Sequence, residues 1–144
     1  MRRARTQEYL PPMFLARAEL YRVQGDMPSA RRDVDEAMLI ATRGEMRLFE
    51  GDGHLEYTRI ALAEKDKAKA REHLDIAAKM VDEMGYHRRD PEVLLATAEL
   101  QLLEGDRDTA RQTLNQAKKR IEEMGCHRYD VDAKRVDEKL EAGN

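Results

Sequence analysis

Residues 66–90 read DKAKAREHLDIAAKMVDEMGYHRRD and residues 106–130 read DRDTARQTLNQAKKRIEEMGCHRYD, so two stretches 40 positions apart align without a gap. A weaker third copy lies another 40 residues earlier, with its matching positions at Asp26, Ala30, Arg31, Val34 and Ala37. Self-similarity at such a period is typical of stacked supersecondary units that bury a core only against one another. We therefore expect recognition by an extended surface rather than chemistry in a pocket.

Apolar residues recur in each copy at steps of four and three, which is the spacing of one face of an α-helix. These positions are Ala30, Val34, Ala37 and Ala41 in the first repeat, Ala70, Leu74, Ala77, Val81 and Met84 in the second, and Ala110, Leu114, Ala117, Ile121 and Met124 in the third. The agreement between the copies predicts an amphipathic helix in the second half of each repeat.

Short polar motifs mark where helices should begin and end. Aspartate is a favoured N-cap, and glycine tolerates the positive φ that commonly ends a helix. The predicted N-caps are Asp26, Asp66, Asp90, Asp106 and Asp130, and the predicted helix-ending glycines are Gly25, Gly85, Gly105 and Gly125. The second repeat has Lys65 where the others have glycine, and Pro91 occupies a favourable first helical position.

The first half of each repeat is predicted to form a more deeply buried helix. In the third repeat, residues 94–103 are apolar on nearly all sides, which is typical of a helix buried from two directions. We expect residues 46–64 to form one long, imperfect helix, the alternative being a break at Gly51 to Gly53. The fold expected is a single all-α domain over residues 1–144, a right-handed α-α solenoid with repeats at about 11–50, 51–90 and 91–130 and a polar capping helix at about 131–141.

The repeats resemble tetratricopeptide repeats. The segment ARAELYRVQGDMPSARRDVDEA carries the family's spacing at Ala18, Tyr21, Gly25, Asp26, Ala30, Val34 and Ala37. The third repeat has Gln101 where the family has an aromatic residue, and the second has Thr58 and Ala61 at the small and aromatic positions. The resemblance covers nearly the whole chain and implies a helical scaffold that binds other proteins.

The period of 40 is longer than the usual tetratricopeptide period of about 34 residues. This longer form is similar to the repeats of kinesin light chains and of the helical sensor regions of bacterial STAND signalling ATPases, such as the maltose-regulon activator. The segments HLEYTRIALAEKD and GYHRRDPE carry the second similarity. The chain contains no glycine-rich phosphate loop followed by Lys-Ser or Lys-Thr, so it lacks the ATPase motif itself.

Composition narrows the function classes. The net charge of −3 argues against a nucleic-acid binder, which usually needs a clearly basic domain. No stretch approaches the roughly 18 apolar residues of a membrane helix, and the first residues lack the apolar core of a signal peptide. Because Cys126 is the only cysteine, no internal disulfide can form. We expect a soluble cytoplasmic protein that binds neither nucleic acid nor membrane.

No cofactor, metal or catalytic constellation is predicted. The four histidines, at positions 54, 73, 87 and 127, show none of the close spacing that metal ligands usually have. His87 and His127 are repeat equivalents, which stacking would hold one repeat apart. Cys126 replaces Tyr86 of the second repeat, so it is expected to pack in a loop rather than to act as a nucleophile.

Two surfaces could bind a partner. Tetratricopeptide stacks usually line their inner curve with first helices, and the resemblance therefore implies groove positions at Leu15, Glu19, Arg22, Leu55, Arg59, Leu62, Glu92, Leu95, Glu99 and Leu102. These leucines could equally belong to the core. The family's carboxylate clamp requires basic and amide groups, so the glutamates of this groove argue against an acidic C-terminal ligand.

The second surface is a possible basic ridge along one edge. Its residues follow the ends of the second helices, and they are Arg43, Arg47, His87, Arg88, Arg89, His127 and Arg128. Positive charge there offsets the helix dipole, so these residues could serve the loops alone. Alternatively, they could dock an acidic partner or a phosphate.

The favoured hypothesis is a non-enzymatic adaptor or scaffold that binds a peptide or helix of another protein in the groove. Homo-oligomers are also possible. The alternative hypothesis is the effector-sensing end of a signalling ATPase or transcription regulator of the STAND class, or a stand-alone relative, with a small ligand in the groove. RNA binding by helical repeats is disfavoured by the charge and by the low aromatic content of 5%.

Overall fold

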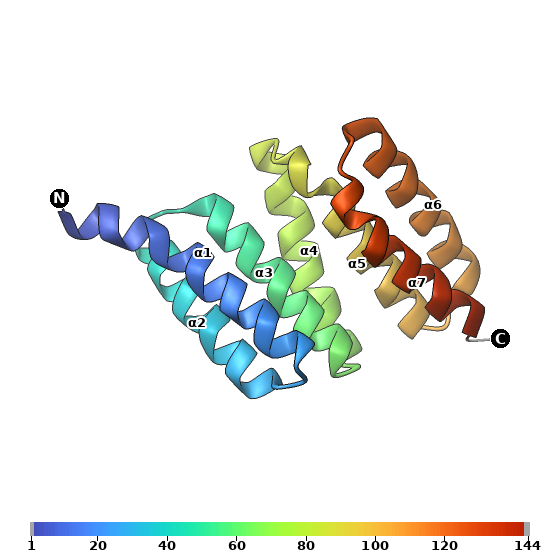
Figure 1. Cartoon of the computed structure of the whole chain (residues 1–144), viewed down its shortest axis with the longest axis horizontal. Coiled ribbons are helices and arrows are strands. Elements are labelled where there is room, and N and C mark those ends of the chain that lie inside the picture. Colours follow the sequence, from blue (N-terminus) through green and yellow to red (C-terminus); the bar gives the residue numbers. More distant parts are fainter. Residues whose placement is uncertain (1, 143–144) are drawn as a thin grey trace.

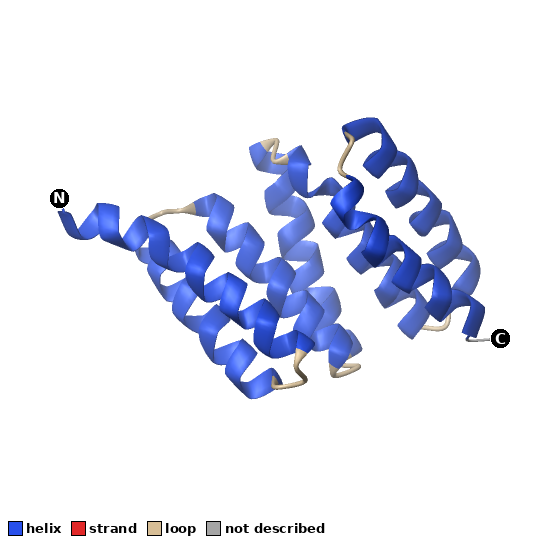
Figure 2. Cartoon of the chain, in the orientation of Figure 1, coloured by secondary structure: helices blue, strands red, loops and turns tan. Residues whose placement is uncertain are grey.

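The computed structural model describes residues 2–142, with side chains described from residue 9 onward. Within this range all regular structure is helical, joined by short turns (Figure 2). Seven α-helices follow one another as α1 (Arg2–Val23), α2 (Met27–Arg43), α3 (Arg47–Ala63), α4 (Lys67–Met84), α5 (Asp90–Leu103), α6 (Arg107–Met124) and α7 (Asp130–Ala142). Single 3-10 turns, η1 (His87–Arg89) and η2 (His127–Tyr129), precede α5 and α7. The prediction of an all-α chain is confirmed.

The helices pack neighbour to neighbour. The pairs α1–α2, α3–α4 and α5–α6 form helical hairpins, and each hairpin packs on the helix that follows it. The odd-numbered helices also contact one another in order, α1 with α3, α3 with α5 and α5 with α7. In Figure 1 the chain progresses from the blue α1–α2 hairpin at one end to the orange α6 and red α7 at the other.

The amphipathic stripes are buried as predicted. In α6 the buried residues include Ala110, Leu114, Ala117 and Ile121, and α2 and α4 bury the corresponding residues of their own stripes. The core consists of three clusters, each built from a hairpin and the helix after it. Small alanines at the contacts let the helix backbones approach closely, so the interior has little room for larger side chains.

Helix caps explain where α2, α4 and α6 begin. The carboxylates of Asp26, Asp66 and Asp106 accept hydrogen bonds from the backbone N–H three residues later, at 3.1–3.2 Å. Gly25 and Gly105 have a positive φ in the preceding turns, and Lys65 adopts a positive φ of 59° at the equivalent position. The predicted caps of these three helices are therefore confirmed, and lysine takes the strained conformation where glycine is missing.

One sequence-based expectation about helix starts is wrong. Asp90 and Asp130 are the first residues of α5 and α7 rather than side-chain N-caps, because a 3-10 turn precedes each helix. The first helix runs from Arg2 to Val23, with Pro11 and Pro12 inside it. The prediction of one helix through Gly51 and Gly53 is confirmed by α3, and α7 occupies the stretch predicted for the last helix.

Candidate functional site

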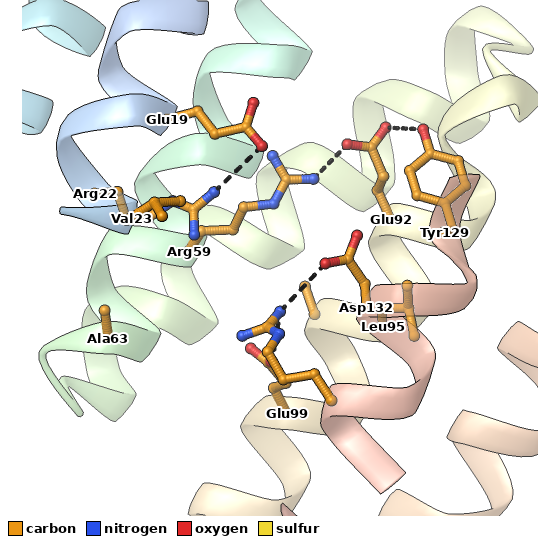
Figure 3. Close-up of a pocket in the computed structure, with 12 residues that line it drawn as sticks. Glu19, Arg22, Val23, Arg59, Ala63, Glu92, Leu95, Glu99, Tyr129 and Asp132 are labelled. Atoms are coloured by element: carbon orange, nitrogen blue, oxygen red, sulfur yellow. Dashed lines mark hydrogen bonds and ion pairs between the residues drawn. The ribbon is translucent and has the colours of Figure 1, made fainter. Parts of the chain in front are cut away.

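The main pocket lies on the face where the odd-numbered helices meet. Its volume is about 430 Å³. It is lined by Glu19, Arg22 and Val23 of α1, Arg59 and Ala63 of α3, Glu92, Leu95, Ala96 and Glu99 of α5, and Tyr129, Asp132 and Arg135 of η2 and α7. Figure 3 shows these side chains converging from the four helices. Every hairpin and the final helix therefore contribute to this one pocket.

Two further pockets adjoin it. One, of about 190 Å³, shares Glu19, Arg59 and Glu92 with the main pocket. The other, of about 320 Å³, shares Glu99 with it. We call the three pockets together the inner groove. The ten groove residues expected from the sequence all line it: Leu15 and Leu55 in the smaller pocket, Leu62 and Leu102 in the other, and the rest in the main pocket.

The leucines of the inner groove are of two kinds. Leu55 and Leu95 are 1% and 6% exposed, so they form its floor and belong to the core at the same time. Leu62 and Leu102 are only partly buried, and each packs against a core cluster while lining the groove. Substituting Leu95 would therefore disturb folding as well as the groove.

A network of arginines and carboxylates occupies the groove floor. Glu56 is 3% exposed and accepts hydrogen bonds from Arg22 Nε at 2.5 Å and from Arg59 Nη1 at 3.2 Å. Arg59 also donates a hydrogen bond to Glu92, which faces it from α5 in the close-up (Figure 3). Arg22 and Arg59 thus link the carboxylates of successive repeats, and they neutralise charges that burial would otherwise make costly.

The network continues toward η1 and η2. Glu92 accepts hydrogen bonds from Arg89 Nη1 at 2.7 Å and from the Tyr129 hydroxyl at 2.9 Å. Arg89 Nε also donates to Asp52 at 2.9 Å. Burial would raise the pKa of Glu92, but the guanidiniums of Arg59 and Arg89 hold that pKa below its usual value. Glu92 is therefore a carboxylate at neutral pH.

The pKa of Asp52 is shifted in the opposite direction from that of Glu92. Burial raises the pKa of Asp52, and the opposing attraction of Arg89 does not fully cancel this effect. Arg89 itself has a raised pKa, because the charges of Glu92 and Asp52 outweigh the burial that would lower it. The groove floor therefore presents fixed, mutually paired charges rather than an open acidic surface.

The α5–α7 side of the groove carries a second set of charges. Glu99 lies 3.1 Å from Arg135 Nη2 and 3.5 Å from Lys139 Nζ. Arg135 also approaches Asp132 at 3.8 Å. Of the groove glutamates expected from the sequence, Glu92 and Glu99 each face a cation from another helix, whereas Glu19 lies 3.8 Å from Arg22 of its own helix. What remains accessible is a mixture of paired charges and apolar surface from residues such as Ala63 and Leu102.

The residues of the possible basic ridge are placed in two ways. Arg89 turns into the groove network instead of lining the edge. The others lie near the turns. His87 approaches Asp90 and His127 approaches Asp130, while Arg88 lies over the ring of Tyr86 and Arg128 over the ring of Tyr129. Arg47 lies 3.8 Å from Glu83, and Arg43 is the last residue of α2. Local partners thus account for most of these charges.

His54 and His73 meet in space although their sequence spacing does not indicate it. Their Nδ1 atoms lie 3.1 Å apart between α3 and α4, their rings are stacked, and the Tyr57 ring lies tilted beside them. Among the described residues, however, no three histidine, cysteine or acidic side chains are grouped so as to hold a metal ion. Cys126 is partly buried in its turn and donates weakly to the Met124 carbonyl oxygen.

Sequence reasoning missed several groove residues, and among them are the network and rim residues Asp52, Glu56, Tyr129, Asp132 and Arg135. One signal was available for Glu56. Its repeat equivalents at positions 16, 96 and 136 are alanine, alanine and valine, so a charge interrupts an otherwise apolar register. Such an interruption indicates a buried charge that must find partners on neighbouring elements.

Comparison with protein-family models, with curated proteins and with solved structures gives no match for this chain. None of the helices in the described part of the chain is both long and apolar enough to cross a membrane. The arrangement of the groove therefore has to be interpreted from its own geometry.

Proposed function

We propose that the chain is a tetratricopeptide-like helical repeat module that binds a peptide or helix of another protein in the inner groove. The observation that carries the proposal is the main pocket, because four helices from successive repeats line it together. A surface built from every repeat suits an elongated ligand better than a compact one. The 40-residue register of the sequence supports the repeat class.

The chemistry of the groove favours an amphipathic ligand. Its accessible apolar residues, including Leu62, Leu102 and Leu103, lie beside paired charges that offer hydrogen bonds at the edges. A helix laid in such a groove would contact it through apolar side chains spaced three and four residues apart. Since the carboxylates and arginines are already paired, a strongly charged ligand would have to disrupt the network.

The inner groove is favoured over the basic ridge for the same reason. Most ridge residues already have partners within the chain, such as Asp90 for His87 and Asp130 for His127. Exposed ion pairs of this kind contribute little binding energy to a new partner. The ridge thus keeps its structural role at the helix ends.

A second candidate function is binding of a small molecule, as in the sensor regions that the sequence resembles. The volume of the main pocket, about 430 Å³, supports it, because small-molecule sites commonly measure about 300–1,000 Å³. Thermal stabilisation of the chain by one compound of a metabolite panel, without any selected peptide, would favour this function over peptide binding.

The experiment that tests the proposal is selection from a random-peptide display library on the immobilised chain. The affinity of the best peptide is then measured by fluorescence anisotropy at about 50 and about 300 mM salt, a range over which screening tightens strongly. Groove binding predicts an affinity that changes little with salt. A marked loss of affinity at high salt that Arg88→Ala and Arg128→Ala reproduce would show that the ridge binds instead.

A further inference from the structure

One face of α1 is apolar and exposed. Tyr9, Met13, Ala16, Leu20 and Val23 follow one another at alternating steps of four and three, so they form a single stripe along the helix. The four larger side chains are 71%, 64%, 55% and 73% exposed, and Ala16 is also exposed. These five residues are called the α1 stripe below.

The register of the α1 stripe recurs in the other odd-numbered helices, where it is buried. Adding 40 to Leu20 gives Ile60, Leu100 and Leu140 in turn, and all three are at most 2% exposed. Adding 120 to the first four stripe residues gives Tyr129 of η2 and Ala133, Val136 and Leu140 of α7, none more than 7% exposed. The positions equivalent to Ala16 and Leu20 are thus buried in every later repeat, whereas the position equivalent to Val23 is exposed at Ala63.

The preceding hairpin covers this register each time. Ile60 packs in one cluster with Ala30 and Val34 of α2. Leu100 packs with Ala70 and Leu74 of α4, and Leu140 belongs to the cluster that contains Ala110 and Leu114 of α6. The α1 stripe therefore has the chemistry of a helix-packing face, and no described hairpin lies against it.

The other end of the molecule is built differently. The exposed residues of α7 are polar or charged, apart from Val131 and the terminal Ala142: Asp130, Lys134, Arg135, Glu138, Lys139 and Glu141. An end-to-end contact between the α1 stripe of one copy and α7 of another would bury many of these charges. Head-to-tail stacking of copies is therefore disfavoured.

We propose that the α1 stripe is a dimerisation surface on which a second copy of this chain docks its own α1 stripe. The stripe is nearly symmetric about Ala16, with Met13 and Leu20 on either side and Tyr9 and Val23 beyond them. A two-fold axis at Ala16 would place the two helices antiparallel, with Met13 of one copy against Leu20 of the other. A two-fold contact must be self-complementary in this way.

The charged residues beside the α1 stripe are compatible with docking of a second copy of the chain. Arg17 donates two hydrogen bonds to Asp33, at 2.6 and 2.7 Å, and Arg22 is held by Glu56. A second copy would therefore bury no unpaired arginine along the stripe. Glu19 is well exposed beside Arg22, so its carboxylate can stay at the solvated rim. Ala16 and Val23 of the α1 stripe also line the edge of the inner groove, whereas Tyr9, Met13 and Leu20 lie outside its three pockets. The dimerisation role does not depend on peptide binding in the groove.

Sedimentation analysis of the full chain tests the proposal through its mass. We expect a dimer at protein concentrations up to about 100 μM, and monomers for Met13→Glu and for Leu20→Lys, because each places two charges in an apolar contact. Val131→Glu is the matched control, since it replaces an exposed apolar residue outside the stripe and should stay dimeric. Both stripe variants should keep the helical circular-dichroism spectrum of the parent chain, because neither side chain is in the core.

The two stripe variants can also be mixed. In the antiparallel pair, the carboxylate introduced by Met13→Glu in one copy would face the ammonium group introduced by Leu20→Lys in the other, while the second Met13–Leu20 contact is kept. A dimer that forms only in the mixture would support the arrangement. A monomeric parent chain, stripe variants that remain dimeric, or a mixture that stays monomeric would overturn it.

Discussion

Glu56 is a buried carboxylate in a register that is otherwise apolar. Its equivalents are small or aliphatic, and Ala96 and Val136 pack in the core. Two arginines, Arg22 and Arg59, satisfy its oxygens and link α1 to α3. Because both arginines also approach a second carboxylate, Glu56 lies at the centre of the groove floor.

Replacing Glu56 with alanine should destabilise the fold by about 3 kcal/mol, because removing one partner leaves buried cations undercompensated. The matched control is Glu36→Ala on the exposed face of α2, which should change the free energy of unfolding by less than about 0.5 kcal/mol. Urea denaturation followed by circular dichroism measures both. Equal effects of the two substitutions would show that the network contributes nothing to stability.

His54 and His73 should make the fold sensitive to acid. Burial lowers the pKa of both imidazoles, and the charge of the other histidine lowers the pKa of His54 further. The unfolded chain therefore binds more protons than the folded chain below about pH 6.5. The stability contribution is present above that pH and is lost as the pH falls through the lowered values of the folded state.

The expected result is a melting temperature that falls between about pH 7.5 and pH 5, and that falls less in His73→Gln. His127→Gln, a substitution at an exposed turn histidine, serves as the control and should retain the parent's acid sensitivity. Thermal melts in matched buffers measure the difference. If the melting temperatures of His73→Gln and of the parent fall by the same number of degrees on acidification, the histidine pair does not cause the acid sensitivity.

At the scale of elements, α3 shows how neighbouring helices decide what a glycine does. Gly51 and Gly53 lie in the same helix, and both are buried. A Cβ added at Gly51 would meet Met84 at 3.6 Å, an ordinary contact, whereas one at Gly53 would lie 2.2 Å from Met38 Sδ of α2. Of the two glycines, only Gly53 therefore lies where an added side chain would collide with Met38 of α2.

Gly51→Ala should stabilise the chain by about 0.5–1 kcal/mol, because alanine restricts the unfolded chain and favours helix. Gly53→Ala should be at least about 1 kcal/mol less stable than Gly51→Ala, since Met38 must move. In a Met38→Ala chain the clash is absent, so Gly53→Ala should there raise the free energy of unfolding instead of lowering it. Chemical denaturation measures the parent and the four variants, and equal stabilities of Gly51→Ala and Gly53→Ala would contradict the close contact.

The elements were predictable where a local pattern specifies them. The stripe of alanine and leucine in α2, α4 and α6 follows directly from helical spacing, and the aspartate caps follow from side-chain chemistry. The start of α1 was not predictable in this way, because Pro11 and Pro12 argue against a helix interior. The 3-10 turns before α5 and α7 were not predicted from the sequence either, since Asp90-Pro91 resembles an ordinary helix start.

The candidate groove was predictable in its backbone positions but not in its charge state. Repeat register and resemblance selected residues that do line the pockets, including Leu62 and Glu99. The pairing of Arg22 with Glu56 and of Arg59 with Glu92 joins residues 34 and 33 positions apart. Pairings of this kind depend on side-chain rotamers across two helices, which composition and spacing alone do not specify.

At the scale of the whole molecule, the account rests on the inner groove as the binding surface. Ala63 lines the main pocket at the end of α3 and is exposed, so a large side chain there would fill the groove without disturbing the core. Ala68, at the start of α4, is also exposed but lies outside the three pockets of the groove. The two alanines therefore form a matched pair for the same substitution.

The most direct measurement is the affinity of the best display-selected peptide for Ala63→Arg and for Ala68→Arg, by fluorescence anisotropy. The account predicts that Ala63→Arg weakens binding by about ten-fold or more, equivalent to about 1.4 kcal/mol, while Ala68→Arg stays within about two-fold of the parent chain. Both variants should melt like the parent. Equal affinities for the two variants, or failure to select any peptide, would contradict the claim that the inner groove binds a partner.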